Sequence, residues 1–192
     1  MNRFHSFLIA CVAIAFVASD AVGKDFEFVQ NVANRINGER AKKGLSRLKY
    51  NETLAKAAQS QAEWMARAQK MEHLRPAPKS LEEHKTCNEH PANRIINAGY
   101  FTWDDLFVVE TRPNGYVVNP RPDTDSRVGE IIAKGANAGH PATQPPQIVP
   151  GWMNSPGHRK TILTPQFEEF GVGCACIGND TYWCVVFAKP KS

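Results

Sequence analysis

The chain has 192 residues, of which 42% are hydrophobic and 22% charged, with 13 glycines and 13 prolines. This composition is typical of a globular protein and excludes a disordered or fibrous chain. The 23 lysines and arginines exceed the 19 acidic residues by only four, and they form no dense basic block. We therefore expect no nucleic-acid partner.

The N-terminal residues have the pattern of an export signal. Residues 7–18 are mostly apolar and follow a single arginine, but the run is too short to span a bilayer as a helix. We expect a signal peptide over residues 1–21 and a single domain over 22–192, with no transmembrane segment after signal removal. A lipid anchor at Cys11 is the weaker interpretation, because a further apolar run follows that cysteine. The expected location is therefore extracellular or periplasmic.

Four cysteines remain after removal of this signal: Cys87, Cys174, Cys176 and Cys184. An even number of cysteines in an exported chain predicts disulfides, with three connectivities open. Residues 170–187 have the alternation of a β-hairpin, and a three-residue loop within them would place Cys174 opposite Cys184. Cys176 would then pair with Cys87. A shift of one residue in the turn would break this pairing.

Two amphipathic helices are expected at the start of the mature chain. Apolar residues repeat at helical spacing from Asp25, which can cap the first helix, to a stop at Gly44. Asn51 can cap a second helix, which we expect to end just past His73 because prolines follow. This second helix is rich in alanine, which predicts that another element packs close against it. A third helix is expected over residues 90–98.

The second half of the chain predicts strands and one further helix. Strands are expected over 103–109 and 115–118. Seven of the 13 prolines lie over residues 112–150, so we expect irregular backbone there with a short ordered piece near 129–134. Ser155 can cap a short helix after this stretch. With the closing hairpin, helices come first and paired strands last.

Two histidines stand where a binding site could form. His73 lies near the expected end of the second helix, and His158 lies in the first turn of the helix that follows Ser155. The positive end of a helix disfavours imidazolium, so His158 should tend toward the neutral form that ligates metals. The sequence contains no nucleophile elbow, phosphate loop, HExxH pair or EF-hand loop, so the enzyme classes carried by those motifs are not indicated.

Short motifs along the chain are those of one protein family. They lie in this order: residues 37–41 (NGERA), 98–100 (AGY), 129–130 (GE), 152–163 (WMNSPGHRKTIL) and 170–173 (FGVG). On these motifs the chain resembles the CAP superfamily, which comprises the cysteine-rich secretory proteins, antigen 5 and the plant pathogenesis-related proteins. It looks like the bacterial, SCP-like extracellular branch of that superfamily. The stretch 152–163 is the most specific part of the resemblance.

The resemblance implies an α+β fold, namely an α-β-α sandwich with a small, mostly antiparallel sheet between helical layers and a large central cleft. In the family, two histidines and two acidic residues line that cleft and can bind a divalent cation. By motif position His73, Glu130 and His158 are three of these four, which implies a weakly held Zn²⁺ or another divalent cation. The second acidic residue is missing, because no Asp or Glu lies between Glu130 and Glu168. The candidates to replace it are Gln144, Gln147 and His140.

The resemblance leaves more than one function open. The favoured function is that of a secreted, non-enzymatic domain whose cleft binds a cation and a lipid-like ligand or cell-surface polymer. The alternative is a metal-assisted, peptidase-like hydrolase, in which a histidine-bound cation activates water and Glu130 is the base. The missing acid weakens the hydrolase hypothesis more than the binding hypothesis, because catalysis needs a firmly held metal. A third interpretation is a structural module that is attracted to anionic surfaces by its mild basic charge.

Overall fold

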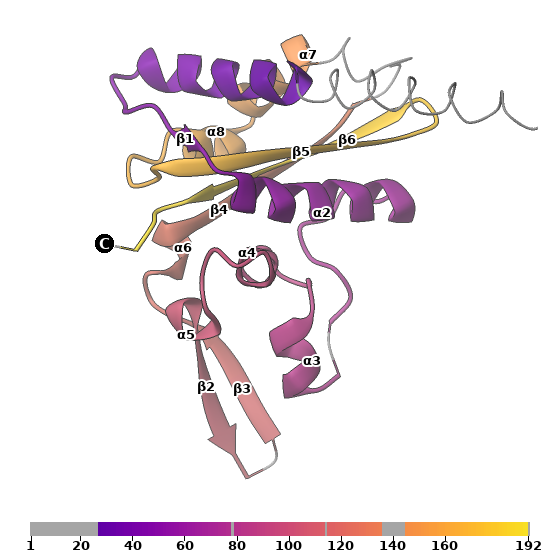
Figure 1. The fold of residues 1–192 in the computed structure, drawn as a ribbon, viewed down its shortest axis with the longest axis vertical. Coiled ribbons are helices and arrows are strands. Elements are labelled where there is room, and N and C mark those ends of the chain that lie inside the picture. Colours follow the sequence, from indigo (N-terminus) through magenta and orange to yellow (C-terminus); the bar gives the residue numbers. More distant parts are fainter. Residues whose placement is uncertain (1–26, 78, 114, 136–144, 192) are drawn as a thin grey trace, which may run out of the picture.

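Helices lie on both sides of a four-stranded sheet in the computed structural model, which describes residues 27–77, 79–113, 115–135 and 145–191 (Figure 1). A helix over residues 27–41 comes first, and it is followed by β1 (Lys49–Tyr50), α2 (Glu52–Ala68), α3 (Leu81–Thr86), α4 (Pro91–Asn97), α5 (Trp103–Leu106), β2 (Phe107–Arg112), β3 (Gly115–Pro120), α6 (Thr124–Arg127), β4 (Val128–Gly135), α7 (Pro145–Asn154), α8 (Pro156–Ile162), β5 (Glu169–Ile177) and β6 (Asp180–Ala188). The strand order is β1-β5-β6-β4, with β1 parallel to β5 and the other neighbours antiparallel. The expected small, mostly antiparallel sheet is confirmed.

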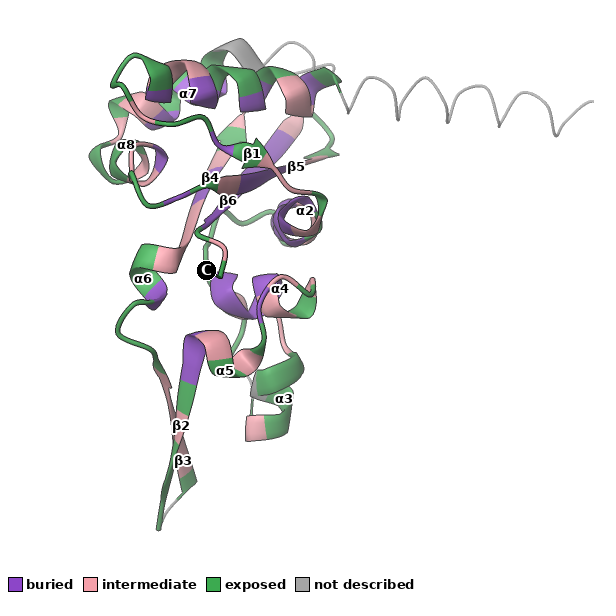
Figure 2. Cartoon of the chain, turned by 60° about the vertical axis from the view of Figure 1, so that its left-hand side comes forward, coloured by how far each residue is buried: buried purple, intermediate pink, exposed green. Residues whose placement is uncertain are grey.

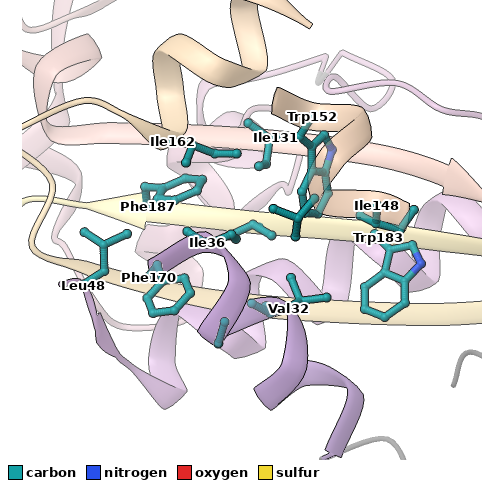
Figure 3. Packing of buried hydrophobic residues seen from close by; sticks show 14 of the residues in the cluster. Val32, Ile36, Leu48, Ile131, Ile148, Trp152, Ile162, Phe170, Trp183 and Phe187 are labelled. Carbon is teal, nitrogen blue, oxygen red and sulfur yellow. The ribbon is translucent and has the colours of Figure 1, made fainter. Parts of the chain in front are cut away.

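The two faces of β6 build two hydrophobic cores. On one face Trp183 and Val185 pack with the helix over residues 27–41, α7 and α8 (Figure 3). On the other face Cys184 and Val186 pack with α2 and α4. All four side chains are fully buried, because β6 lies inside the sheet and both of its faces are covered. This is the helix–sheet–helix sandwich that the resemblance implies.

The contact between α2 and β5 is made by backbone as much as by side chains. A Cβ atom at Gly171 would lie 2.0 Å from the backbone nitrogen of Ala55, and one at Gly173 would lie 2.3 Å from that of Gln59. The small residues of α2 therefore meet a strand that carries no side chain at these two positions. The close packing expected from the alanine content of α2 is confirmed.

The start of α2 is as expected, but its end is not. The Asn51 side chain accepts hydrogen bonds from the backbone nitrogens of Thr53 and Leu54 and so caps the helix. The helix ends at Ala68 because Gln69 adopts a left-handed conformation (φ 52°). The expectation that the helix reaches past His73 is wrong, and His73 lies in the loop that follows.

The other expected helices lie close to their predicted positions. The first helix ends before Gly44, which has a positive φ of 68°, whereas its expected cap Asp25 lies outside the described residues. In α4 the side chain of His90 caps the helix by accepting a hydrogen bond from the Ala92 nitrogen. The helix expected after Ser155 is α8, although the Ser155 side chain makes no capping hydrogen bond. These three predictions are confirmed.

The middle of the chain is more ordered than its prolines suggest. The strand expected from Trp103 begins as the helical turn α5, where the Asp105 carboxylate accepts a hydrogen bond from the Thr102 nitrogen. The strand expected over 115–118 and the ordered piece expected near 129–134 are confirmed as β3 and β4, whereas α6 and α7 form where irregular backbone was expected. Pairing with β6 along the whole length of β4 and burial of Ile131 outweigh the prolines nearby.

The closing hairpin turns one residue more tightly than expected. Gly178 has a positive φ of 56°, and with it the turn needs only two residues, so that Ile177 pairs with Asp180. The expected three-residue loop would have paired Ile177 with Thr181. A shift of one position moves every side chain of one strand relative to its partner.

This register overturns the expected disulfide. Cys174 stands opposite Trp183, and its side chain lies on the face of the sheet that Cys184 does not share. The Cys174–Cys184 pairing is therefore wrong. No disulfide is shown among the four described cysteines, and the bridge expected between Cys87 and Cys176 stays a prediction.

Arg40 fastens the first helix to α8, the element that carries His158. It is fully buried, and its guanidinium donates hydrogen bonds to the carbonyl oxygens of Ser46, Ile162, Thr164 and Phe167. Such bonds satisfy a buried cation without a carboxylate. They fix where α8 ends relative to the rest of the fold.

Burial follows these layers. Figure 2 shows buried residues on the sheet and on the helix faces turned toward it, whereas the β2–β3 hairpin projects from the body and is buried mainly at its base. Within the part of the chain that the structure describes, no helix is long and apolar enough to cross a membrane.

Candidate functional site

The loop after α2 holds His73 at the edge of the sheet. Its backbone is tied down on both sides of this histidine: the Gln61 amide donates to the Glu72 carbonyl oxygen at 2.6 Å, and Arg94 Nη2 donates to the His73 carbonyl oxygen at 3.1 Å. The imidazole itself remains 45% exposed. A fixed backbone with an accessible ring is suitable for binding a ligand.

Glu130 lies on β4 and connects this histidine with α4. Its side chain is only 2% exposed, and its Oε1 lies 2.9 Å from His73 Nδ1. Its Oε2 accepts a hydrogen bond of 2.6 Å from Arg94 Nη2, and the Arg94 side chain is completely buried. Both carboxylate oxygens are therefore engaged within the protein.

This arrangement sets the hydrogen-bonding role of each His73 nitrogen. Burial alone would raise the pKa of Glu130, but the charge of Arg94 and the hydrogen bonds from His73 and Arg94 outweigh it and hold that pKa below its ordinary value. Glu130 is thus ionised and can only accept, so His73 Nδ1 donates. In the neutral ring Nε2 is then the acceptor that is left for a ligand.

Two residues of this network were missed by sequence reasoning. Arg94 lies on the buried side of α4 beside Ala92 and Ile95, and a charged residue on such an apolar helix face is the signal that could have found it. Cys184, expected in a disulfide, is a fully buried thiol whose Sγ lies 3.5 Å from Glu130 Oε2. Burial raises the pKa of Cys184 well above its ordinary value, so the thiol stays protonated and donates.

His158 lines a cavity next to this dyad. The cavity has a volume of about 490 Å³ and lies between β4, α7 and α8. Its wall is formed by Met71, Ile132, Ala133, Lys134, Gly135, Gln147, Ile148, Gly151, Trp152, Ser155 and His158. The described wall contains no acidic residue, in agreement with the missing second acid. Of its proposed replacements Gln147 is present, whereas Gln144 and His140 lie outside the described residues.

The structure brings part of the predicted cation site together. His73 and Glu130 are in direct contact, and His158 is near enough for a charge on His73 to lower its pKa. However, the described residues contain no group of three or more His, Cys, Asp or Glu side chains that could hold a metal ion. Glu130 is turned toward Arg94 and His73, which leaves the imidazoles as the accessible donors.

The protonation of His158 predicts how stability depends on pH. Burial, and then the charge of His73, lower its pKa below the ordinary 6.5. As the pH drops, His158 therefore binds its proton at a higher pH in the unfolded chain than in the folded protein. The free energy of unfolding should fall as the pH drops from about 7.5 to about 5.5. A series of thermal melts over this range should show the melting temperature falling less steeply for His158→Asn than for the unaltered protein. Equal slopes would contradict the assignment.

The fold and the carboxylate-held histidine at the sheet edge define an SCP-type domain. The family model described as "Cysteine-rich secretory protein family" (CAP) matches residues 33–187, and the chain belongs to this family. The relative YkwD of Bacillus subtilis strain 168, an uncharacterized protein, is 29% identical over 146 residues, which are 76% of this chain and 42% of that protein. The chain thus matches less than half the length of this relative.

Solved structures agree with this fold. An outer surface protein of Borrelia burgdorferi superposes with a TM-score of 0.58 at 20% identity, covering 86% of this chain and 94% of that one. An extracellular protein containing an SCP domain from Bacillus anthracis strain Ames also gives a TM-score of 0.58, at 18% identity, covering 86% and 41% respectively. At such identities the likeness is one of fold.

Proposed function

We propose that the chain is a secreted binding domain, in which His73 and His158 weakly hold a divalent cation beside a cavity for a lipid-like ligand or a cell-surface polymer. The observation that carries this proposal is the engagement of both Glu130 oxygens by His73 and Arg94. The carboxylate orients an imidazole instead of facing the ligand. The outer-surface and extracellular proteins of similar fold support a secreted location.

The donor set suits a weakly bound cation. A histidine that ligates a metal usually donates its other ring nitrogen to a carboxylate, and His73 makes this contact with Glu130. His158 favours the neutral form that a metal needs, because burial lowers its pKa. Zn²⁺ takes four ligands, and two imidazoles leave the others to water or to the bound ligand.

The cavity beside His158 suits an amphipathic ligand. Ile132, Ile148 and Trp152 supply apolar wall, while Gln147 and Ser155 supply polar groups. Ligand sites are usually concave and largely apolar, with a few convergent polar groups. A lipid-like chain or an uncharged segment of a polymer has this chemistry.

The metal-assisted hydrolase is supported less well. Its base would be Glu130, whose side chain is 2% exposed and is bound to the buried Arg94. A general base must lie within hydrogen-bond reach of the proton that it removes from substrate water. To reach a cation or water Glu130 would have to leave Arg94, and a buried arginine without its partner is costly.

Calorimetry can test the cation. Zn²⁺ is titrated into the chelator-treated protein, into the His73→Ala/His158→Ala double variant, and into His90→Asn, which removes an imidazole outside the proposed pair. We expect heat of binding for the unaltered protein and His90→Asn, and none for the double variant. Equal binding by the double variant, or no binding by the unaltered protein, would remove the cation from the proposal.

A further inference from the structure

A second cavity lies where the chain after β6 passes α6 (Figure 1). Its volume is about 330 Å³, and it shares no lining residue with the cavity beside His158. The lining consists of Asp123, Ser126, Arg127, Lys189, Pro190 and Lys191. The Lys189 nitrogen donates to the Arg127 carbonyl oxygen at 2.9 Å, which fixes the two segments against each other.

Three cationic side chains line this cavity beside a single carboxylate. Asp105, which pairs with Lys191, lies outside the lining, and the excess of positive charge remains when it is counted. A cavity with this balance of charge attracts anions. We propose that it binds a phosphate group, either free or attached to a larger molecule. The site uses no residue of the proposed cation site or of the cavity beside His158, and it depends on neither.

Arg127 is held in place before any ligand arrives. Its side chain is only 16% exposed, and its Nη1 donates to the Asp105 carbonyl oxygen at 2.8 Å. Its guanidinium carbon lies 4.6 Å from the centre of the Phe101 ring. Among the described residues, no hydrogen bond engages its Nε or Nη2. An arginine fork that is already oriented can bind two phosphate oxygens at once and loses little freedom in doing so.

The carboxylate of Asp123 is a weak competitor for this arginine. Its Oδ2 lies 3.8 Å from Arg127 Nη1, which is longer than a hydrogen bond, and its side chain is 58% exposed. Ion pairs that are this exposed contribute little to stability. An arriving phosphate can therefore displace Asp123 from Arg127 at little cost.

Two lysines bring positive charge from the second segment. No hydrogen bond or ion pair among the described residues engages the ammonium of Lys189, and that of Lys191 pairs with Asp105 but has further N–H donors. Cations from two segments suit a tetrahedral phosphate, whose oxygens point in several directions, better than a planar carboxylate. Small-molecule pockets measure about 300–1,000 Å³, so this cavity has room for a phosphate and a small attached group.

Amide chemical shifts can test the ligand class. Inorganic phosphate, glycerol phosphate, glycerate and Ca²⁺ are titrated separately into the metal-free protein. We expect both phosphates to give saturable shifts at Arg127, Lys189 and Lys191, and glycerate to bind more weakly. Equal affinity for the two phosphates would identify free phosphate as the ligand, and tighter binding of glycerol phosphate would identify an attached one. No saturation with either phosphate, equal affinity for glycerate, or saturation of these amides by Ca²⁺ would each overturn the proposal.

Two variants with opposite expected effects locate the binding. Lys189 is exposed, and the Asp123 side chain makes no capping hydrogen bond to α6, so both variants should fold. Lys189→Gln should weaken glycerol phosphate binding by about three- to fivefold, and Asp123→Asn should strengthen it by about as much, since each alters one charge near the phosphate. The exposed Lys56 lies outside this lining, and Lys56→Gln should bind as the unaltered protein does. Equal weakening by Lys189→Gln and Lys56→Gln, or no strengthening by Asp123→Asn, would show that the phosphate does not bind in this cavity.

Discussion

Gly171→Ala should destabilise the fold more than most single substitutions. The added Cβ would lie 2.0 Å from the Ala55 nitrogen and 2.3 Å from the Leu54 carbonyl carbon, and both are backbone atoms of α2 that no rotamer change can move. Overpacking typically costs about 1–3 kcal/mol, and we expect about 3 kcal/mol or more because the helix must shift as a unit. For a domain of this size the melting temperature should fall by roughly 6–12 °C.

A glycine in open surroundings provides the matched control. A Cβ at Gly157 in α8 meets nothing within 4 Å, and this glycine has no positive φ. Gly157→Ala should therefore leave the melting temperature unchanged or raise it slightly, since alanine restricts the unfolded chain. If the two variants melt at the same temperature, the contact between α2 and β5 is looser than the structure indicates.

The elements that the sequence predicts well are those whose signals are local. Asn51 caps α2 through bonds to the next few residues, and Gly44 and Gly99 take the positive φ that their positions after helices suggest. The end of α2 could not be predicted in the same way. Its stop, Gln69, is not a glycine, and residues other than glycine rarely adopt a left-handed conformation.

The predictions are least accurate where a distant segment, or the exact length of a turn, decides the structure. The sequence predicts only a short ordered piece near 129–134, and the full strand β4 comes from pairing with β6, which lies far away in the sequence. The register of the closing hairpin depends on a single turn residue, and the disulfide prediction depended on that register. Local patterns are weakest for β4, because the pairing energy that fixes it is tertiary.

The candidate site was also predicted only in part. Motif position identified His73, Glu130 and His158, and the structure brings the first two into contact. Motif position could not predict the orientation of Glu130, because the residue that turns its carboxylate inward is Arg94, 36 residues away in the sequence. A ligand set inferred from residue types alone assumes that each carboxylate faces the cleft.

Arg94→Met should be the substitution that most disturbs the site. Arg94 donates to Glu130 and to the carbonyl oxygens of Asn88, Glu89 and His73, so it holds both the carboxylate and the histidine loop. Its removal leaves the ionised Glu130 in an apolar setting without its counter-charge. Breaking a buried ion pair from one side costs about 3–5 kcal/mol, and urea unfolding should detect a loss of this size.

Removing the second charge separates electrostatics from lost packing. In the Arg94→Met/Glu130→Leu double variant neither charge of this buried pair remains, so it should be more stable than Arg94→Met despite carrying one more change. Recovery should be partial, because the carbonyl oxygens of Asn88, Glu89 and His73 still lack their donor. A double variant no more stable than Arg94→Met would mean that Arg94 acts through the loop carbonyls alone. Glu130 would then be neutralised in some other way, and the orientation of His73 would no longer require Arg94.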